Sequence, residues 1–399
     1  METDIEAIAQ PRILWLQVCS LAGLQGAITL TWVIYNLYLP LLFAEFGFPK
    51  SLAVGVLIVE NALAVVMEPL MGGLSDKARY WIGSRFPFIS VGVILSSALF
   101  IAIPSIATFS TASNGTRLLL LLVVIAWAIA MTVFRSPAIS LLGRYATPAE
   151  LPLAGSLVTL AGGIITALRP FASKYILGLG PIFTFAIGSF VLLAAAAALR
   201  FVNPPERPVD KAQTWATPGE LPRALALILG TGIGVAWGSR FLMDALGKLL
   251  KVQWNTGNID GIMFIISLVL ALAALPAGAF ATKIGNRKAM LSGISAIIII
   301  MVIIISLGAQ LPIVLLGVCA FSLIINGAVP FALTLVPPRW RGLGVGMYFA
   351  GFALTGSVFG VVFPQPQAIT PVIGIIGGVL AFLVAGVCIF AASYGREVA

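Results

Sequence analysis

Residues 51–74 read SLAVGVLIVENALAVVMEPLMGGL, and this stretch decides the fold class. The run is apolar apart from small polar residues and the two carboxylates Glu60 and Glu68. A helix of this length crosses a hydrocarbon core of about 30 Å. Similar runs recur along the whole sequence, which predicts an all-α integral membrane protein with twelve transmembrane helices. We expect the spans at residues 13–43, 51–74, 86–109, 117–142, 152–178, 181–202, 223–250, 259–281, 289–309, 311–336, 342–363 and 369–394.

The composition excludes a water-soluble protein. Hydrophobic residues make up 60% of the 399 residues and charged residues only 9%, and the mean hydropathy is +1.09. A soluble fold needs a charged exterior, so lipid is the solvent that suits this chain. Residues 1–10 are acidic rather than basic, so no cleavable signal peptide is expected.

The distribution of basic residues explains the net charge of +9. Most of the lysines and arginines between the expected spans fall on the side that carries both termini, and few fall on the other. This is the positive-inside bias, which places both termini in the cytoplasm. The charge therefore reports topology, and no nucleic-acid partner is expected.

Residue types that carry enzyme chemistry are sparse. Cys19, Cys319 and Cys388 all fall inside apolar spans, and the chain has no histidine. No metal site, cofactor or nucleophile–base pair is expected, and hence no enzyme activity. Without histidine, any proton coupling must use carboxylates.

The chain divides near its middle. Residues 203–222 are rich in proline and charge, and we expect them to link two six-helix bundles, residues 1–202 and residues 223–399. A repeat supports this division, because GGLSDK (residues 72–77) after the second span matches GAFATK (residues 278–283) after the eighth. Two matching halves imply parallel repeats about an axis normal to the membrane, with a binding site between them.

The first of these loops resembles a family signature. Residues 72–85 are similar to the pattern Gly-x-Leu-Ala-Asp-Arg-x-Gly-Arg-Arg of the major facilitator superfamily of transporters. Residues 68–76 (EPLMGGLSD) and 83–89 (GSRFPFI) look like the second-span signature of the glycoside–pentoside–hexuronide cation symporters and the sucrose–proton symporters. Residues 134–144 (FRSPAISLLGR) resemble the end of the fourth span in the sucrose branch. The resemblance implies two pseudo-symmetric bundles that carry a sugar or glycoside.

A conformational latch at the basic loops is also implied by the resemblance. A carboxylate at a helix end pairs with arginines and caps neighbouring helix termini. Thr282 replaces the acid in the second half, where we expect a weaker latch. The positions that match the signature are Gly72, Asp76, Lys77, Arg85, Gly285 and Arg287.

Two positions depart from the symporters that the chain resembles. Ala64 stands where those families have a further acid one turn before Glu68, and Arg144 stands where the sucrose branch has an aspartate. Two acids four residues apart form an oxygen cage for sodium, whereas a single carboxylate is better suited to carrying a proton. We therefore expect coupling to H+ rather than to sodium.

Ionisable groups inside the spans are candidate coupling residues. Glu60 lies near the middle of the second span, where desolvation favours the protonated acid. It is either a proton carrier or a protonated acid in a helix–helix hydrogen bond. Glu68 and Arg135 each lie about 12 Å from the same end of their spans. Equal depth predicts an ion pair, which is either structural or opened by a proton or solute.

Charged residues in two other spans leave similar alternatives. Arg240, Asp244 and Lys248 are spaced by four and share one face of the seventh span. They form either a local ladder of ion pairs or part of the cavity wall, with Asp244 as a further proton-coupling candidate. Arg169 in the fifth span has no partner in its own helix and is a candidate cavity residue.

A polar and aromatic stripe on the first span is too polar to face lipid, so we expect it to bind the solute or, alternatively, to pack in the core. Amides and hydroxyls beside an indole suit a sugar, through hydrogen bonds and stacking. Weaker candidates of the same kind lie in the second half. The stripe is Gln25, Thr29, Trp32, Tyr35 and Asn36, and the second-half candidates are Trp237, Asn326 and Tyr348.

Together these features predict a secondary active transporter that moves a small polar solute, a sugar or glycoside, with H+ by alternating access. One rival is an exporter of amphiphilic or cationic compounds, which would need a wider and more aromatic cavity. Another is a non-transporting assembly factor or a lipid- or pigment-handling protein. We expect a monomer surrounded by lipid in a bacterial inner membrane.

Overall fold

The computed structural model describes residues 13–204, 219–255, 258–363 and 369–394. Twelve of its helical units are long and apolar enough to cross a membrane within these residues, which confirms the predicted all-α membrane fold. Three of the twelve are broken into two pieces, namely α4 with α5, α9 with α10, and η1 with α13. The elements are α1 (Trp15–Glu45), α2 (Lys50–Ile82), α3 (Phe86–Phe109), α4 (Asn114–Ile139), α5 (Leu142–Tyr145), α6 (Leu151–Gly178), α7 (Pro181–Val202), α8 (Glu220–Gln253), α9 (Asp260–Leu272), α10 (Ala274–Ile284), α11 (Asn286–Leu307), α12 (Leu311–Leu335), η1 (Pro338–Trp340), α13 (Arg341–Val362) and α14 (Pro371–Tyr394).

The second span is longer than predicted. The sequence placed its end at residue 74, but α2 continues to Ile82 and carries Asp76 within its last turns. No helix breaker stands between Leu74 and Gly83, so the polar residues there extend the helix beyond the apolar run. Gly83 ends α2 in a left-handed conformation with φ 80°.

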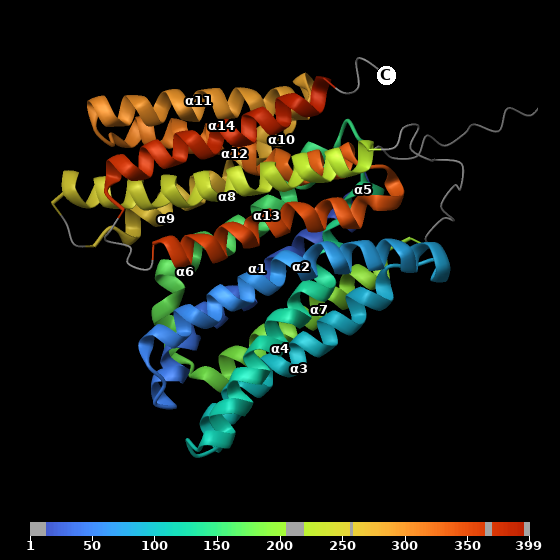
Figure 1. The fold of residues 1–399 in the computed structure, drawn as a ribbon, viewed down its shortest axis with the longest axis vertical. Coiled ribbons are helices and arrows are strands. Elements are labelled where there is room, and N and C mark those ends of the chain that lie inside the picture. Colours follow the sequence, from blue (N-terminus) through green and yellow to red (C-terminus); the bar gives the residue numbers. More distant parts are fainter. Residues whose placement is uncertain (1–12, 205–218, 256–257, 364–368, 395–399) are drawn as a thin grey trace, which may run out of the picture.

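Two groups of helices have their own hydrophobic cores. One cluster of buried apolar residues lies almost entirely on α1 to α7, and the second lies on α8 to α14. Figure 1 shows α13 between α8 of its own group and α2 of the other group. We call the two groups the first half and the second half. The predicted linker is mostly outside the described residues, since residues 205–218 belong to it.

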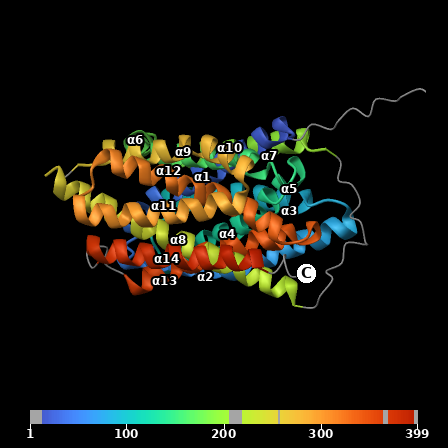
Figure 2. The same cartoon turned by 90° about the horizontal axis from the view of Figure 1, so that it is seen from above.

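One end of the molecule carries the start of α1, the end of α7, the start of α8 and the end of α14, and we call it the terminal end (Figures 1 and 2). The opposite end carries the connection between α1 and α2, and we call it the loop end. In Figure 1, α3 and α4 diverge from α11 and α14 towards the loop end. The two halves are therefore more widely separated there than at the terminal end.

Two sets of helices join the halves, namely α2 with α13, and α6 with α9 and α10. Small residues allow the first pair to approach closely. A Cβ at Gly346 would lie 2.8 Å from the Cα of Pro69 and would overlap the carbonyl of Glu68. A Cβ at Gly72 would overlap the carbonyl of Gly342 in the same way. Close contact between backbones is how membrane helices associate without a hydrophobic drive between them.

Most polar contacts across the halves lie at the terminal end, while Ser357 on α13 donates to the carbonyl of Ile58 on α2 at 3.2 Å nearer the loop end. Arg341 on α13 donates from Nη1 to the carbonyl of Gly143 at 2.5 Å. Asn326 on α12, a predicted solute ligand, donates from Nδ2 to the carbonyl of Pro152 at 3.0 Å across the halves. The Arg341 and Asn326 contacts close the terminal end.

Candidate functional site

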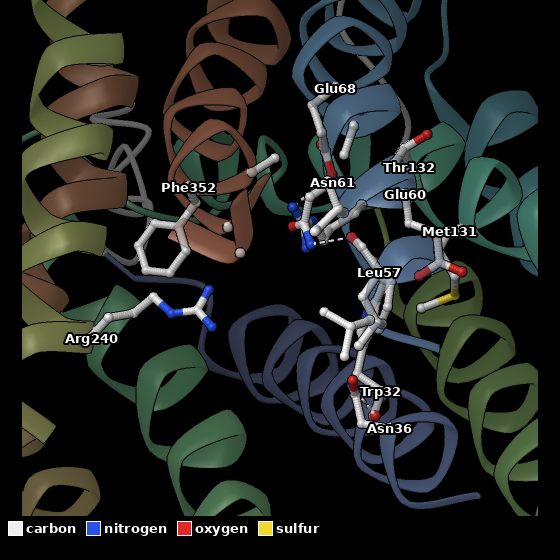
Figure 3. Close-up of a pocket in the computed structure, with 18 residues that line it drawn as sticks. Trp32, Asn36, Leu57, Glu60, Asn61, Glu68, Met131, Thr132, Arg240 and Phe352 are labelled. Atoms are coloured by element: carbon white, nitrogen blue, oxygen red, sulfur yellow. Dashed lines mark hydrogen bonds and ion pairs between the residues drawn. The ribbon is translucent and has the colours of Figure 1, made fainter. Parts of the chain in front are cut away.

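A cavity of about 380 Å³ lies between the halves, within the size range of small-molecule sites. Helices α1, α2 and α4 line it from the first half, and α8 and α13 line it from the second (Figure 3). Glu68 and Arg135 border it on the side of the terminal end. The lining residues are Trp32, Asn36, Val54, Leu57, Ile58, Glu60, Asn61, Ala64, Glu68, Ala128, Met131, Thr132, Arg135, Arg240, Phe352, Ala353, Gly356 and Gly360.

Glu60 is the least compensated acid of this cavity. Its residue is only 4% exposed, and its Oε1 accepts a hydrogen bond from the hydroxyl of Tyr35, which is fully buried. Its Oε2 has no hydrogen-bond partner among the described residues. Behind it, the ring of Tyr35 packs 4.2 Å from that of Trp127 and 5.7 Å from that of Trp32. An ionised carboxylate with one neutral donor is costly to bury, so this site suits a group that exchanges a proton.

Glu68 and Arg135 form the predicted ion pair. Arg135 Nη2 lies 2.7 Å from Glu68 Oε1, and the hydroxyl of Ser136 donates to Glu68 Oε2. The Glu68 side chain is completely buried, whereas that of Arg135 is 22% exposed. The Arg135 guanidinium also lies 4.2 Å from the centre of the Phe349 ring on α13. The charges of Glu68 and Arg135 therefore cancel, and Arg135 also contacts the second half through Phe349.

The charged ladder on α8 is only partly formed. Lys248 Nζ pairs with Asp244 at 2.7 Å and also donates to the carbonyl of Ile369 at 2.6 Å. Arg240 stands apart from this pair, because its guanidinium lies over Phe359 at 4.7 Å and lines the cavity. Asp244 and Lys248 thus form a local ion pair, whereas Arg240 is part of the cavity wall.

The stripe on α1 reaches the cavity with only part of its length. Trp32 and Asn36 line the cavity, and Asn36 Nδ2 also donates to the carbonyl of Trp32 at 2.7 Å. Gln25 and Thr29 lie against Gly162 of α6, and Thr29 donates to the carbonyl of Gln25 at 2.9 Å. The part of α1 nearer the terminal end thus packs against α6 of its own half, away from the cavity.

Three other solute candidates lie away from the cavity lining. Trp237 packs among aromatic rings, 5.4 Å from Phe241 and 5.5 Å from Phe359. Tyr348 is buried on α13 next to Phe352, at 5.8 Å between ring centres. Arg169 is exposed on α6. Their predicted role in solute binding stays a prediction.

Asp76 holds the halves together at the terminal end. Its carboxylate pairs with the buried Arg85 and accepts hydrogen bonds from the backbone N–H groups of Gly342 at 3.0 Å and Leu343 at 2.9 Å. Arg85 donates further to Ser140 Oγ at 2.7 Å. The acid therefore caps the start of α13 in the other half, as the signature implied.

The matching loop of the second half makes no such bridge in the described residues. Thr282 donates to the carbonyl of Gly278 within its own helix, and Arg287 donates to the carbonyl of Ala392 in its own half. Gly285 has a φ of 95° between α10 and α11. Lys77, in the first half, is exposed at the surface.

Several lining residues were not predicted. Thr132 and Met131 precede Arg135 by three and four residues, so they share its face of α4. Asn61 follows Glu60 on α2 and donates to the carbonyl of Leu57 at 2.7 Å. Helical spacing from the intramembrane charges would have found these residues. Phe352 carried no comparable signal.

Comparison with known families decides the assignment. The family model described as "Major Facilitator Superfamily" matches residues 21–361. The chain belongs to the Major Facilitator Superfamily. Its family and its structural neighbours are transporters of small molecules across membranes. The narrower likeness to the glycoside and sucrose symporters stays a prediction, and no curated protein matches the sequence.

Solved structures of other transporters share the fold. A bacterial homologue of the iron transporter ferroportin in its outward-facing state has a TM-score of 0.73 at 14% identity, with 95% of this chain and 99% of that chain covered. FucP in its outward conformation has a TM-score of 0.69 at 13% identity, covering 94% and 98%. The human organic anion transporter MFSD10 has a TM-score of 0.62 at 17% identity, covering 96% and 99%. At these identities the likeness shows the fold alone.

Proposed function

We propose that this chain is a secondary active transporter that moves a small polar solute, a sugar or glycoside, together with H+. The observation that carries the proposal is Glu60, an under-compensated acid in a cavity between the two halves. A buried carboxylate whose Oε2 lacks a protein partner can take up a proton when the solute binds and release it when the site opens to the other side.

The lining of the cavity supports a polar solute. Asn36, Asn61 and Thr132 supply amide and hydroxyl groups, and Trp32 supplies an indole whose Nε1 has no partner among the described residues. A few placed polar groups beside an aromatic face suit a sugar ring. An exporter of amphiphilic or cationic compounds would need a wider and more aromatic cavity, and it is disfavoured because the described lining of this cavity of about 380 Å³ holds two aromatic residues, Trp32 and Phe352.

The contacts between the halves support alternating access. Asp76 and Arg341 close the terminal end, which the positive-inside bias assigns to the cytoplasm. The cavity extends from Glu68 towards Val54 and Gly360 near the loop end. We infer an outward-facing state, from which rocking of the halves would break the Asp76 contacts and expose Glu60 to the cytoplasm.

Transport in proteoliposomes tests this function. We expect wild-type protein to catalyse counterflow of at least one of a panel of labelled sugars and to accumulate it when the outside is acidified. Glu60→Gln should keep counterflow, which needs no net proton movement, but lose accumulation. Asp260→Asn, which removes an exposed acid at the start of α9, should behave like the wild type. If no sugar shows saturable exchange, the sugar assignment is wrong. If Glu60→Gln still accumulates the sugar, the coupling assignment is wrong.

A further inference from the structure

Tyr35 on α1 holds the carboxyl group of Glu60 but does not belong to the described lining of the cavity. Its hydroxyl donates a hydrogen bond to Glu60 Oε1, and the residue is completely buried. The other carboxyl oxygen, Oε2, has no hydrogen-bond partner among the described residues. The proton of the neutral acid is therefore carried by Oε2, while Oε1 keeps its contact with Tyr35 in both protonation states.

A stack of aromatic rings fixes the position of this hydroxyl. The ring centre of Tyr35 lies 4.2 Å from that of Trp127 on α4, and Trp127 stacks on Phe100 of α3 at 5.2 Å. Phe100 in turn lies 4.3 Å from Phe185 of α7. All four residues are completely buried. A ring packed in this way cannot turn aside without opening a void, so the phenol oxygen stays beside Glu60.

Both partners of this hydrogen bond belong to the first half of the protein. Tyr35 is on α1, Glu60 is on α2, and the supporting rings are on α3, α4 and α7. Rocking of the halves therefore leaves the bond in place, unlike the contacts of Asp76 with α13. Glu60 keeps the same donor whichever way the cavity opens, and only its access to solvent and solute changes.

We propose that Tyr35 is a positioning residue for proton exchange: its hydroxyl orients the Glu60 carboxyl group and sets the pH range in which that group binds and releases H+. The inference rests on the proposed transport function and assigns the residue that tunes its proton site. A phenol donates more strongly to a carboxylate than to a neutral acid, so the bond favours the ionised form. Without this bond the buried acid would hold its proton more tightly and release it more slowly to the cytoplasm.

The other titratable and charged groups around Glu60 are paired, uncharged or across the cavity. Glu68 lies about 12 Å farther along α2 and is paired with Arg135 of α4 at 2.7 Å. Tyr348 of α13 is an uncharged phenol buried among aromatic rings. Arg240 of α8 is exposed, and Figure 3 shows it across the cavity from Glu60. The hydroxyl of Tyr35 is thus the polar group that touches the acid.

Infrared difference spectroscopy of the purified full-length protein follows the protonation of Glu60 without solute or transport. The carbonyl stretch of a protonated carboxyl group appears as the pH falls, and the band that Glu60→Gln removes belongs to Glu60. In Tyr35→Phe we expect the midpoint of this titration to move upward by about one pH unit, a 10-fold tighter hold on the proton, because a charge-assisted hydrogen bond is lost. The band should also move to higher frequency, since the carbonyl oxygen no longer accepts a hydrogen bond.

Tyr38→Phe provides a matched control on the same helix. Tyr38 lies one turn beyond Tyr35, is buried, and donates its own hydrogen bond to the carbonyl of Ile176 at 2.7 Å. Its substitution also removes one buried phenol hydroxyl, but it leaves Glu60 untouched. We expect Tyr38→Phe to keep the wild-type midpoint and band frequency, even where both variants lower thermal stability.

The outcomes separate this inference from the transport function. An unchanged midpoint in folded Tyr35→Phe, an equal shift in Tyr38→Phe, or the absence of a titrating band that Glu60→Gln removes would each overturn the role of Tyr35. An unchanged midpoint together with H+-driven accumulation of a labelled sugar by the wild type would leave the transport function standing. The expected shift without counterflow of any labelled sugar would support the role of Tyr35 at the acid and refute the transport function.

Discussion

Asp76→Asn offers the most direct test of how the halves are held together. The substitution keeps the shape of the side chain and removes its charge. Arg85 and Asp76 both belong to the first half, so their ion pair persists whichever way the halves rock. The Asp76 contacts that exist only in the closed terminal end are the two hydrogen bonds from Gly342 and Leu343, at 3.0 and 2.9 Å.

The size of the expected shift follows from those two bonds. A hydrogen bond to a charged group contributes about 1.5–3 kcal/mol, compared with about 0.5–1.5 kcal/mol for a neutral one. An asparagine has a single acceptor oxygen, so one bond is lost and the other is weakened. The closed state should lose about 2–3 kcal/mol relative to the open state, or about 30–150-fold in the equilibrium.

Labelling of a buried thiol measures this equilibrium. Ser156 on α6 is fully buried against Gly278 of the other half near the terminal end. In a background that lacks the three native cysteines, Ser156→Cys should react slowly with N-ethylmaleimide. Adding Asp76→Asn should raise the labelling rate by about the same 30–150-fold, because labelling requires the open state.

Two controls separate opening from simple destabilisation. Ser140→Ala removes a partner of Arg85 without touching α13, so it should lower thermal stability and leave the labelling rate unchanged. Thr282→Ala removes a hydrogen bond within α10 at the position that corresponds to Asp76, where no carboxylate bridges the halves in the described residues, and it should also have no effect. An unchanged labelling rate in folded Asp76→Asn would refute the latch, as would equal acceleration by Ser140→Ala.

Three further changes test the packing and the cavity. Glu68→Gln should destabilise the protein by about 3 kcal/mol by stranding Arg135, and adding Arg135→Gln should restore part of this in thermal unfolding; no restoration would mean that the pair is not coupled. Gly346→Val should prevent α13 from approaching α2 and abolish a monodisperse folded peak, whereas Gly73→Ala meets only an ordinary contact at 3.7 Å and should be tolerated. Trp32→Ala should weaken solute binding about 10-fold through loss of the stacking face; an unchanged dissociation constant would exclude Trp32 from the site.

Depth within the membrane could be predicted from particular residues. Glu68 and Arg135 were placed at the same level by counting helical rise to the ends of their spans, and they form an ion pair at 2.7 Å. Hydropathy could not predict that α2 continues to Ile82. The helix extends past the last apolar residues of the span into polar residues, where hydropathy falls. Span ends judged from hydropathy therefore mark the lipid boundary rather than the helix end.

The number of spans and the placement of charges within them follow from the amino-acid sequence alone. In lipid the backbone N–H and C=O groups of a segment must form hydrogen bonds with each other, so a long apolar run forms a helix. Which helix faces meet was decided by the tertiary structure. Trp32 and Asn36 reach the cavity while Gln25 and Thr29 meet α6, and Arg240 separates from its neighbours Asp244 and Lys248. These differences depend on which neighbouring helices approach each face and at what tilt, which a pattern within one helix does not encode.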